Sequence, residues 1–270
     1  MNKAVLPIDP ATLPVVTEES VLIFDLDNTL YPSSCDLFSQ VSVLIGKYVS
    51  DYLGLPPEQA YLIQKTYFRQ YGTTLRGLML EHKIDPADYL NKVHDIDLSV
   101  VAPAPVLSNA LNALPCRKVI FTNASRNHAQ RVMERLGIAD HFETIFDIVD
   151  ADYIPKPEQQ PYDRMLARDG INPKNAIYFE DMAKNLLPAK DMGMTTVWVH
   201  SDSDWAHEGR DDPRIDHETD DLPAFLEMLV AKSARRSGRK TTITIIISPS
   251  CTDAGTVERY NQSKYADRQS

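Results

Sequence analysis

Short apolar runs recur along the chain, and each has the length of a buried β-strand. The clearest occupy residues 21–24, 118–121, 176–179 and 196–199, and residues 145–149 indicate a further short strand or an extended loop. Between two of these runs lies a segment with apolar positions at helical spacing, Arg126–Leu136, which Gly137 follows as a cap. Strands that alternate with helices predict right-handed crossovers and a parallel sheet. Ligands of such sheets bind beyond the carboxyl ends of the strands.

The interval between the first two predicted strands is too long for a simple crossover. Residues 33–106 have a helical pattern, which begins with an amphipathic stripe of Leu37, Val41, Leu44, Ile45 and Tyr48. Pro56 and Pro57 open a second helix that residues 60–71 continue, and residues 75–82 and 87–93 are further helical candidates. We therefore expect a helical cap, inserted after the first strand, that covers the ligand-binding edge and returns through a proline-rich hinge at residues 102–105.

This pattern predicts a division of the chain into four parts. Residues 1–19 form an N-terminal extension, residues 20–32 and 107–232 the core with its parallel sheet, and residues 33–106 the cap. From residue 233 a basic cluster precedes a β-prone stretch and a polar end. This last segment is either an electrostatic tail for a partner or, as we favour, a poorly ordered extension over residues 233–270.

The first strand ends in two carboxylates one residue apart, within Asp25-Leu26-Asp27-Asn28-Thr29-Leu30. Side chains alternate along a strand, so Asp25 and Asp27 can converge on one point just beyond its end. A divalent cation relieves the repulsion between two such acids, and oxygen ligands suit Mg²⁺. The alternative is an ordinary Asp-Asn turn in which the carboxylates only cap the next segment.

The later strand ends and loops carry polar residues as well. Thr122 and Asn123 precede a helix and can bind an anion with backbone N–H groups, although an ordinary N-cap gives the same pattern. Lys156 stands between two prolines, which stiffen the loop that presents its ammonium, although an exposed lysine in a turn is the alternative. Glu180 and Asp181 follow another buried strand, where Asp181 could simply cap a helix. We favour one shared site because four separate coincidences are otherwise required.

Composition limits the class of partner. The chain has 270 residues, 43% of them hydrophobic, which is ample for a buried core. Its net charge of −10 argues against a nucleic-acid polymer as partner, since phosphate backbones bind basic surfaces. Three cysteines without paired spacing are typical of a reducing compartment. Residues 1–19 lack a signal-peptide pattern and no apolar run reaches the length of a membrane span, so we expect a cytoplasmic protein without a membrane partner.

Taken in order, the motifs at residues 25–30, Thr122-Asn123, Lys156-Pro157 and Glu180-Asp181 resemble those of the haloacid dehalogenase superfamily. The resemblance covers about residues 20–230 and implies a Rossmann-like α/β core with an inserted helical cap. Many members have Gly where this chain has Asn28. Within the superfamily, residues 30–32, 71–78 and 121–124 look like the pyrimidine 5′-nucleotidase group.

The resemblance also implies a role for each motif. Asp25 would be the nucleophile that forms an aspartyl-phosphate. Asp27 would protonate the leaving alkoxide and then help to deprotonate the water that hydrolyses the intermediate. Mg²⁺ would be bound by the Asp25 carboxylate, the Asp27 backbone carbonyl and Asp181. Thr122, Asn123 and Lys156 would hold the phosphoryl oxygens. Glu180 would support the metal from behind, and Lys184 and Asn185 would orient Asp181 or the substrate.

The presence of Asp27 favours phosphoryl transfer over dehalogenation, because only an alcohol leaving group needs a nearby acid. The sequence thus predicts a Mg²⁺-dependent phosphate monoesterase whose substrate is a small phosphorylated molecule, a nucleoside 5′-monophosphate by the subgroup resemblance. A sugar phosphomutase or another small-metabolite phosphatase is the alternative, and a non-catalytic binding protein is disfavoured because every residue needed for turnover is present. In the cap, Tyr71, Thr74 and Arg76 are candidate substrate contacts, for which structural roles are an equal alternative.

Overall fold

A computed structural model of the chain describes residues 9–237, and its centre is a six-stranded sheet in which all strands are parallel. The strand order is β3-β2-β1-β4-β5-β6. The strands are β1 Val21–Phe24, β2 Arg117–Phe121, β3 Thr144–Phe146, β4 Ala176–Glu180, β5 Thr195–Val199 and β6 His217–Thr219. The α/β fold and the four main strands are confirmed to within one residue at each end. The run at 145–149 contributes only the short β3, and β6 was not predicted.

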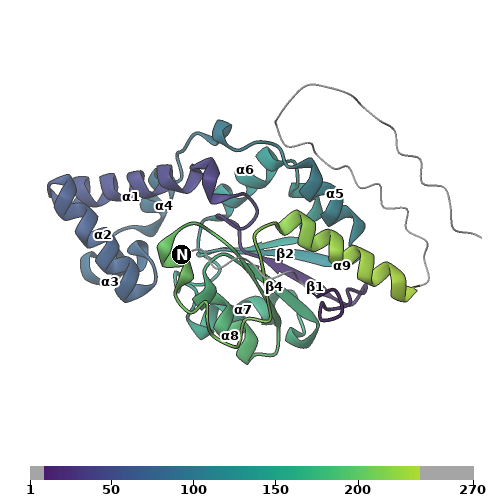
Figure 1. The fold of residues 1–270 in the computed structure, drawn as a ribbon. Helices are drawn as coiled ribbons and strands as arrows, with labels where there is room; N and C mark the ends of the chain where they lie inside the picture. Colours follow the sequence, from purple (N-terminus) through teal and green to yellow (C-terminus); the bar gives the residue numbers. More distant parts are fainter. Residues whose placement is uncertain (1–8, 238–270) are drawn as a thin grey trace, which may run out of the picture. The chain divides into compact units, whose positions relative to one another are not determined.

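Helices pack on both faces of the sheet (Figure 1). One face carries α5 Pro105–Ala113, α6 Arg126–Leu136 and α9 Leu222–Ser237, and the other carries α7 Gln159–Asp169 and α8 Ala183–Asp191. Alternation along β1 explains the two layers, because Leu22 and Phe24 join the first apolar cluster whereas Val21 and Ile23 join the second. The central strand is therefore buried on both sides, which accounts for its continuous apolar sequence.

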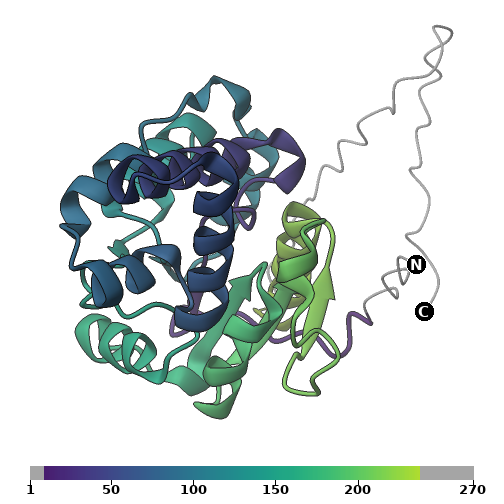
Figure 2. The ribbon, with the colours of Figure 1, turned by 90° about the vertical axis from the view of Figure 1, so that its left-hand side faces the viewer.

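Before α5, four α-helices follow β1, as the helical pattern predicted. They are α1 Leu37–Leu53, α2 Pro57–Tyr71, α3 Thr74–His82 and α4 Pro86–Val93. They share an apolar cluster of their own, which includes Tyr48, Leu78 and Tyr89. Helices α2 and α3 approach closely at Gly77, where an added Cβ would lie 2.4 Å from Cγ of Tyr67. Figure 2 shows these four helices from their own side of the molecule.

The start of the described chain packs against its end. The hydroxyl of Ser233 accepts a hydrogen bond from the backbone N–H of Val16 at 2.9 Å, and Lys232 Nζ donates to the carbonyl of Ala11 at 2.8 Å. Helix α9 continues to Ser237, so the prediction of a poorly ordered tail from residue 233 was wrong for the first residues of that segment. The remainder of the predicted tail, and residues 1–8, lie outside the described residues. No helix within residues 9–237 has the length and apolarity needed to cross a membrane.

Candidate active site

The end of β1 places two aspartates at the carboxyl edge of the sheet. The backbone N–H of Asp25 donates to the carbonyl of Phe179 at 2.9 Å, which extends the pairing of β1 with β4 by one residue. The chain then turns at Asn28, whose φ of 59° lies in the left-handed region. Asparagine tolerates this region better than most residues other than glycine, which explains Asn at a position where glycine also fits. Asp25 and Asp27 thereby line the same cavity.

Lys156 reaches this edge through a loop that Asn123 holds in place. The Asn123 Oδ1 atom accepts a hydrogen bond from the backbone N–H of Lys156 at 2.9 Å. The ammonium of Lys156, only 1% exposed, donates to Asp25 Oδ1 at 2.8 Å and to Glu180 Oε2 at 2.6 Å. It also contacts the carbonyl of Phe121 at 2.8 Å and the hydroxyl of Tyr178 at 3.0 Å. Burial alone would lower the pKa of Lys156, but the two carboxylates raise it, so the side chain is a buried cation.

Three buried carboxylates gather beside this cation. Asp25, Glu180 and Asp181 each offer an oxygen, and these oxygens lie within 4.8 Å of one another. Burial and the neighbouring Glu180 raise the pKa of Asp25 to about 7, and the same two causes raise the pKa of Asp181. Within residues 9–237, neither Oδ2 of Asp181 nor Oδ1 of Asn185 has a hydrogen-bond partner, although both are buried. Unpartnered oxygen acceptors in a net negative cluster fit a hard divalent cation such as Mg²⁺.

Asp27 is held by two donors that sequence reasoning missed. Its Oδ1 atom lies 2.6 Å from the hydroxyl of Tyr31 and 2.9 Å from Nε2 of His128. Burial tends to raise the pKa of Asp27, but His128 and Tyr31 lower it overall. The sequence held one signal for His128, which shares a helical i, i+4, i+8 stripe with Val132 and Leu136 and therefore lies on the buried face of α6.

The predicted phosphate-binding residues reach the same cavity. Thr122 and Asn123 line it together with Lys156. The hydroxyl oxygen of Thr122 accepts a hydrogen bond from the backbone N–H of Ala124 at 3.0 Å, so its hydrogen remains available to a ligand. Asn123 instead uses its Oδ1 to hold the backbone of Lys156. The structure thus brings all three residues together, with Asn123 acting partly through the lysine loop.

Core and cap enclose the cavity, which has a volume of about 140 Å³. From the cap side it is lined by Phe38, Phe68, Thr74 and His94, and Trp205 closes it from the loop after β5. Thr74 is buried and its hydroxyl donates to the carbonyl of Gln64 at 3.0 Å, which is a structural role.

Three other predicted contacts lie away from this cavity. Tyr71 donates a hydrogen bond to Glu81 on α3, and neither Tyr71 nor Arg76 is among the described residues that line the cavity. Lys184, expected to orient Asp181 or the substrate, is likewise not among the described residues that line the cavity. Its ammonium forms an ion pair with Glu208 at 2.9 Å and lies over the ring of Phe68 at 5.5 Å.

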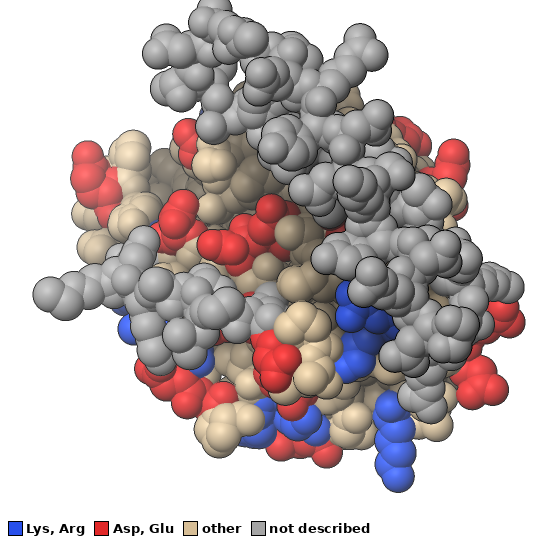
Figure 3. Space-filling view, turned by 45° about the vertical axis from the view of Figure 1, so that its right-hand side comes forward, with Lys and Arg blue, Asp and Glu red and all other residues tan. Residues whose placement is uncertain are grey.

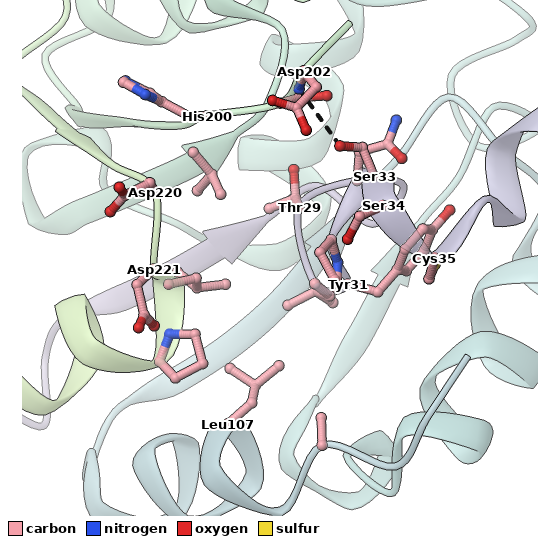
Figure 4. Close-up of a pocket in the computed structure, with 18 of the residues that line it drawn as sticks. Thr29, Tyr31, Ser33, Ser34, Cys35, Leu107, His200, Asp202, Asp220 and Asp221 are labelled. Atoms are coloured by element: carbon pink, nitrogen blue, oxygen red, sulfur yellow. Dashed lines mark hydrogen bonds between the residues drawn. The ribbon is translucent and has the colours of Figure 1, made fainter. Parts of the chain in front are cut away.

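A larger cavity, of about 990 Å³, lies on the other side of the turn after β1. In Figure 4, Asp220 and Asp221 lie opposite Ser33 and Ser34 across this space. Acidic side chains also gather around a hollow on the face shown in Figure 3, in keeping with the net charge of −10. Among the described residues, however, only the cluster around Asp25 brings three potential metal ligands together. The placement of the carboxylates, rather than the cavity volume, therefore marks the smaller cavity as the candidate site.

Comparison with known proteins agrees with the α/β fold and indicates a family. A sequence model of the family described as haloacid dehalogenase-like hydrolase matches residues 22–199. Phosphate metabolism protein 8 of Saccharomyces cerevisiae is 29% identical over 231 residues, which cover 78% of this chain and 70% of that protein. Phosphoglycolate phosphatase of Neisseria gonorrhoeae is 24% identical over 191 residues, 65% of this chain and 78% of that protein. The fold is similar to that of a HAD phosphatase from Thermococcus onnurineus, with a TM-score of 0.53, 18% identity, and coverage of 78% of this chain and 97% of that one.

Proposed function

We propose that this chain, which belongs to the haloacid dehalogenase-like hydrolase family, is a Mg²⁺-dependent phosphate monoesterase that forms an aspartyl-phosphate. The observation that carries the proposal is the pair Asp25 and Asp27, two carboxyl groups that line one cavity and have different hydrogen-bond partners. One is bonded to the buried cation Lys156, and the other is held by Tyr31 and His128. A nucleophile beside an independent acid suits an ester whose leaving group needs a proton.

In the proposed reaction, a carboxylate oxygen of Asp25 attacks phosphorus and the bond to the leaving-group oxygen breaks. Asp27 gives its proton to that oxygen, and an alcohol leaves. A water molecule then attacks phosphorus of the aspartyl-phosphate and gives a proton to Asp27. The bond between phosphorus and the Asp25 oxygen breaks, so that Asp25 is regenerated and phosphate is released. Lys156 holds Asp25 in place and, together with Thr122, offers positive charge and a hydrogen-bond donor to the phosphoryl oxygens.

A magnesium ion would be held by the carboxylates of Asp25 and Asp181 and by the backbone carbonyl of Asp27. The unpartnered Oδ2 of Asp181 supports this assignment, because a buried carboxylate oxygen without a hydrogen-bond donor is free to bind a cation. When bound, Mg²⁺ screens the negative charge shared by the attacking carboxylate and the phosphoryl group. Glu180 supports the site from behind, since its Oε2 accepts from Lys156 and Tyr178.

The resemblance to the pyrimidine 5′-nucleotidase group and an aromatic wall both favour a nucleoside 5′-monophosphate as substrate. The ring centroid of Trp205 lies 5.8 Å from that of Phe38 and 5.9 Å from that of Phe68, and all three side chains line the cavity. Such a wall offers apolar faces to a planar base. The volume of about 140 Å³ favours instead a compact ester. A phosphatase of small metabolites is therefore the second candidate.

Phosphate release from a panel of monoesters tests the proposal. The panel comprises pyrimidine and purine nucleoside monophosphates, sugar phosphates and phosphoglycolate, each with Mg²⁺ and with a chelator. We expect release with Mg²⁺ only, and Asp25→Asn should abolish it while the protein stays folded. Absence of release from every ester would refute the proposal, and so would turnover by Asp25→Asn.

A further inference from the structure

We propose that Tyr31 and His128 are positioning residues that direct the proton of Asp27 to its Oδ2 atom, which faces the leaving group. Both donors meet the same oxygen, since the Tyr31 hydroxyl and His128 Nε2 lie 2.6 Å and 2.9 Å from Oδ1. Among residues 9–237 no hydrogen bond reaches Oδ2, and Asp27 lines the cavity. This inference rests on the proposed function, in which Asp27 transfers protons.

The choice of oxygen follows from the two hydrogen bonds. An oxygen that already accepts from a phenol and an imidazole has both in-plane lone pairs engaged, so a proton on the carboxyl group sits on the other oxygen. Two donors at fixed angles also remove rotation about the bond that carries the carboxyl group of Asp27. The acid is thereby held in one orientation before the substrate enters, which lowers the entropy lost on reaching the transition state.

The position of His128 is itself fixed by its surroundings. Its side chain is 1% exposed, and its ring stacks on that of His94 with centroids 4.4 Å apart and planes 17° apart. Nδ1 of His94 lies 3.0 Å from the hydroxyl of Ser125, the N-cap residue of α6. The carbonyl of His94 accepts from Arg131 at 3.0 Å. Because His94 directly follows α4, the last cap helix, the chain that returns from the cap supports the acid of the core.

The step balances without any proton transfer to or from Tyr31 and His128. The O–H bond at Oδ2 of Asp27 breaks as the phosphorus–oxygen bond to the leaving group breaks, and the proton ends on the leaving alcohol. The same Oδ2 later takes a proton from the attacking water. Tyr31 and His128 keep their hydrogen bonds to Oδ1 in both halves, so they act only through the orientation of Asp27.

Leaving-group dependence distinguishes positioning from a structural role. We would measure kcat/KM, which reports formation of the aspartyl-phosphate, for an alkyl phosphate that the phosphate-release panel identifies and for 4-nitrophenyl phosphate. The nitrophenolate can leave without a proton, whereas the alkoxide must receive a proton in order to leave. For His128→Leu and Tyr31→Phe we expect a loss of about 10- to 100-fold on the alkyl ester and less than about 3-fold on the nitrophenyl ester. His128→Gln, whose amide can still donate, should recover part of the loss.

Tyr48→Phe is a matched control, because it removes a tyrosine–aspartate hydrogen bond of 3.2 Å to Asp88 within the cap. It should leave both kcat/KM values within about 2-fold. If folded His128→Leu and Tyr31→Phe lost kcat/KM equally on both esters, or on neither, the inference would be overturned. Wild-type turnover would still support the proposed function in that case. A wild type that releases no phosphate from any ester would overturn both.

Discussion

Replacing Lys156 by methionine tests whether one buried cation compensates the acidic cluster. Lys156 Nζ lies 2.8 Å from Asp25 and 2.6 Å from Glu180, and the three side chains are 1%, 9% and 1% exposed. Methionine fills much of the same volume but leaves two buried carboxylates without their cation. Breaking a buried pair in this way costs about 3–5 kcal/mol of unfolding free energy.

Lys118 provides a matched control in the same strand layer. It is also buried, at 7% exposure, and its ammonium donates to the carbonyls of Leu114 at 2.7 Å and Cys116 at 2.9 Å. Its partners are neutral, so Lys118→Met should cost only about 1–3 kcal/mol, the desolvation cost of groups left unsatisfied. Lys118 lies near the start of β2, away from the carboxyl edge, so catalytic turnover should survive in this variant.

The assay is urea unfolding followed by circular dichroism at pH 7 in the presence of a chelator, with phosphate release measured in parallel with Mg²⁺. We expect Lys156→Met to lose more stability than Lys118→Met and to lose turnover as well. If the two variants lost equal stability, the reasoning that Lys156 neutralises Asp25 and Glu180 would be wrong. Retained turnover in folded Lys156→Met would refute its proposed role at the phosphoryl group.

Three further predictions concern packing, protonation and metal binding. Gly77→Ala places a Cβ 2.4 Å from Cγ of Tyr67. Urea unfolding should therefore show a loss of about 1–3 kcal/mol of unfolding free energy, despite the better helix propensity of alanine. An unchanged or increased stability would contradict the packing of α2 on α3. Burial lowers the pKa of His94 from 6.5 to about 3, so below pH 6.5 the unfolded chain binds a proton that the folded chain does not, and stability falls. Between pH 7 and pH 5 the wild type should therefore lose about 2 kcal/mol more than His94→Phe, and parallel pH profiles would exclude a buried neutral imidazole. Mg²⁺ should raise the Tm of the wild type by binding the folded state, and Asp181→Asn should reduce this rise; an equal rise in both proteins would exclude Asp181 as a ligand.

The fold was largely predictable because its signals are local. Each main strand contains a run of at least three apolar residues, and most cap helices have an apolar stripe or a proline start, so no knowledge of distant contacts was needed. Strand β6, His217–Thr219, has no such run. It is a strand because it pairs with Val197 to Val199 of β5, an interaction that sequence periodicity does not encode. Likewise Ser233 belongs to a helix because the N-terminal segment packs there, although its local composition is typical of a tail.

The candidate site was predictable only as far as the strand ends define it. Asp25 and Asp181 follow buried strands, and parallel strands bring such ends to one edge. The partners within the site depend on tertiary contacts. Glu180 was expected behind the metal, and the sequence did not reveal that its Oε2 atom accepts hydrogen bonds from Lys156 and Tyr178. His128 meets Asp27 across 101 positions of sequence, a pairing that no local pattern reveals.

The central claim is that Asp25 carries the phosphoryl group during turnover, and acid quenching followed by peptide mass analysis tests it most directly. Wild-type protein is mixed with Mg²⁺ and an excess of the best ester and quenched within the first turnovers, and the peptide that contains Asp25 is weighed. The account predicts a peptide heavier by one phosphoryl group, with the group on Asp25, and no such species in Asp25→Asn. Rapid turnover with an unmodified Asp25 peptide at every quench time, or with the phosphoryl group on another residue, would contradict it.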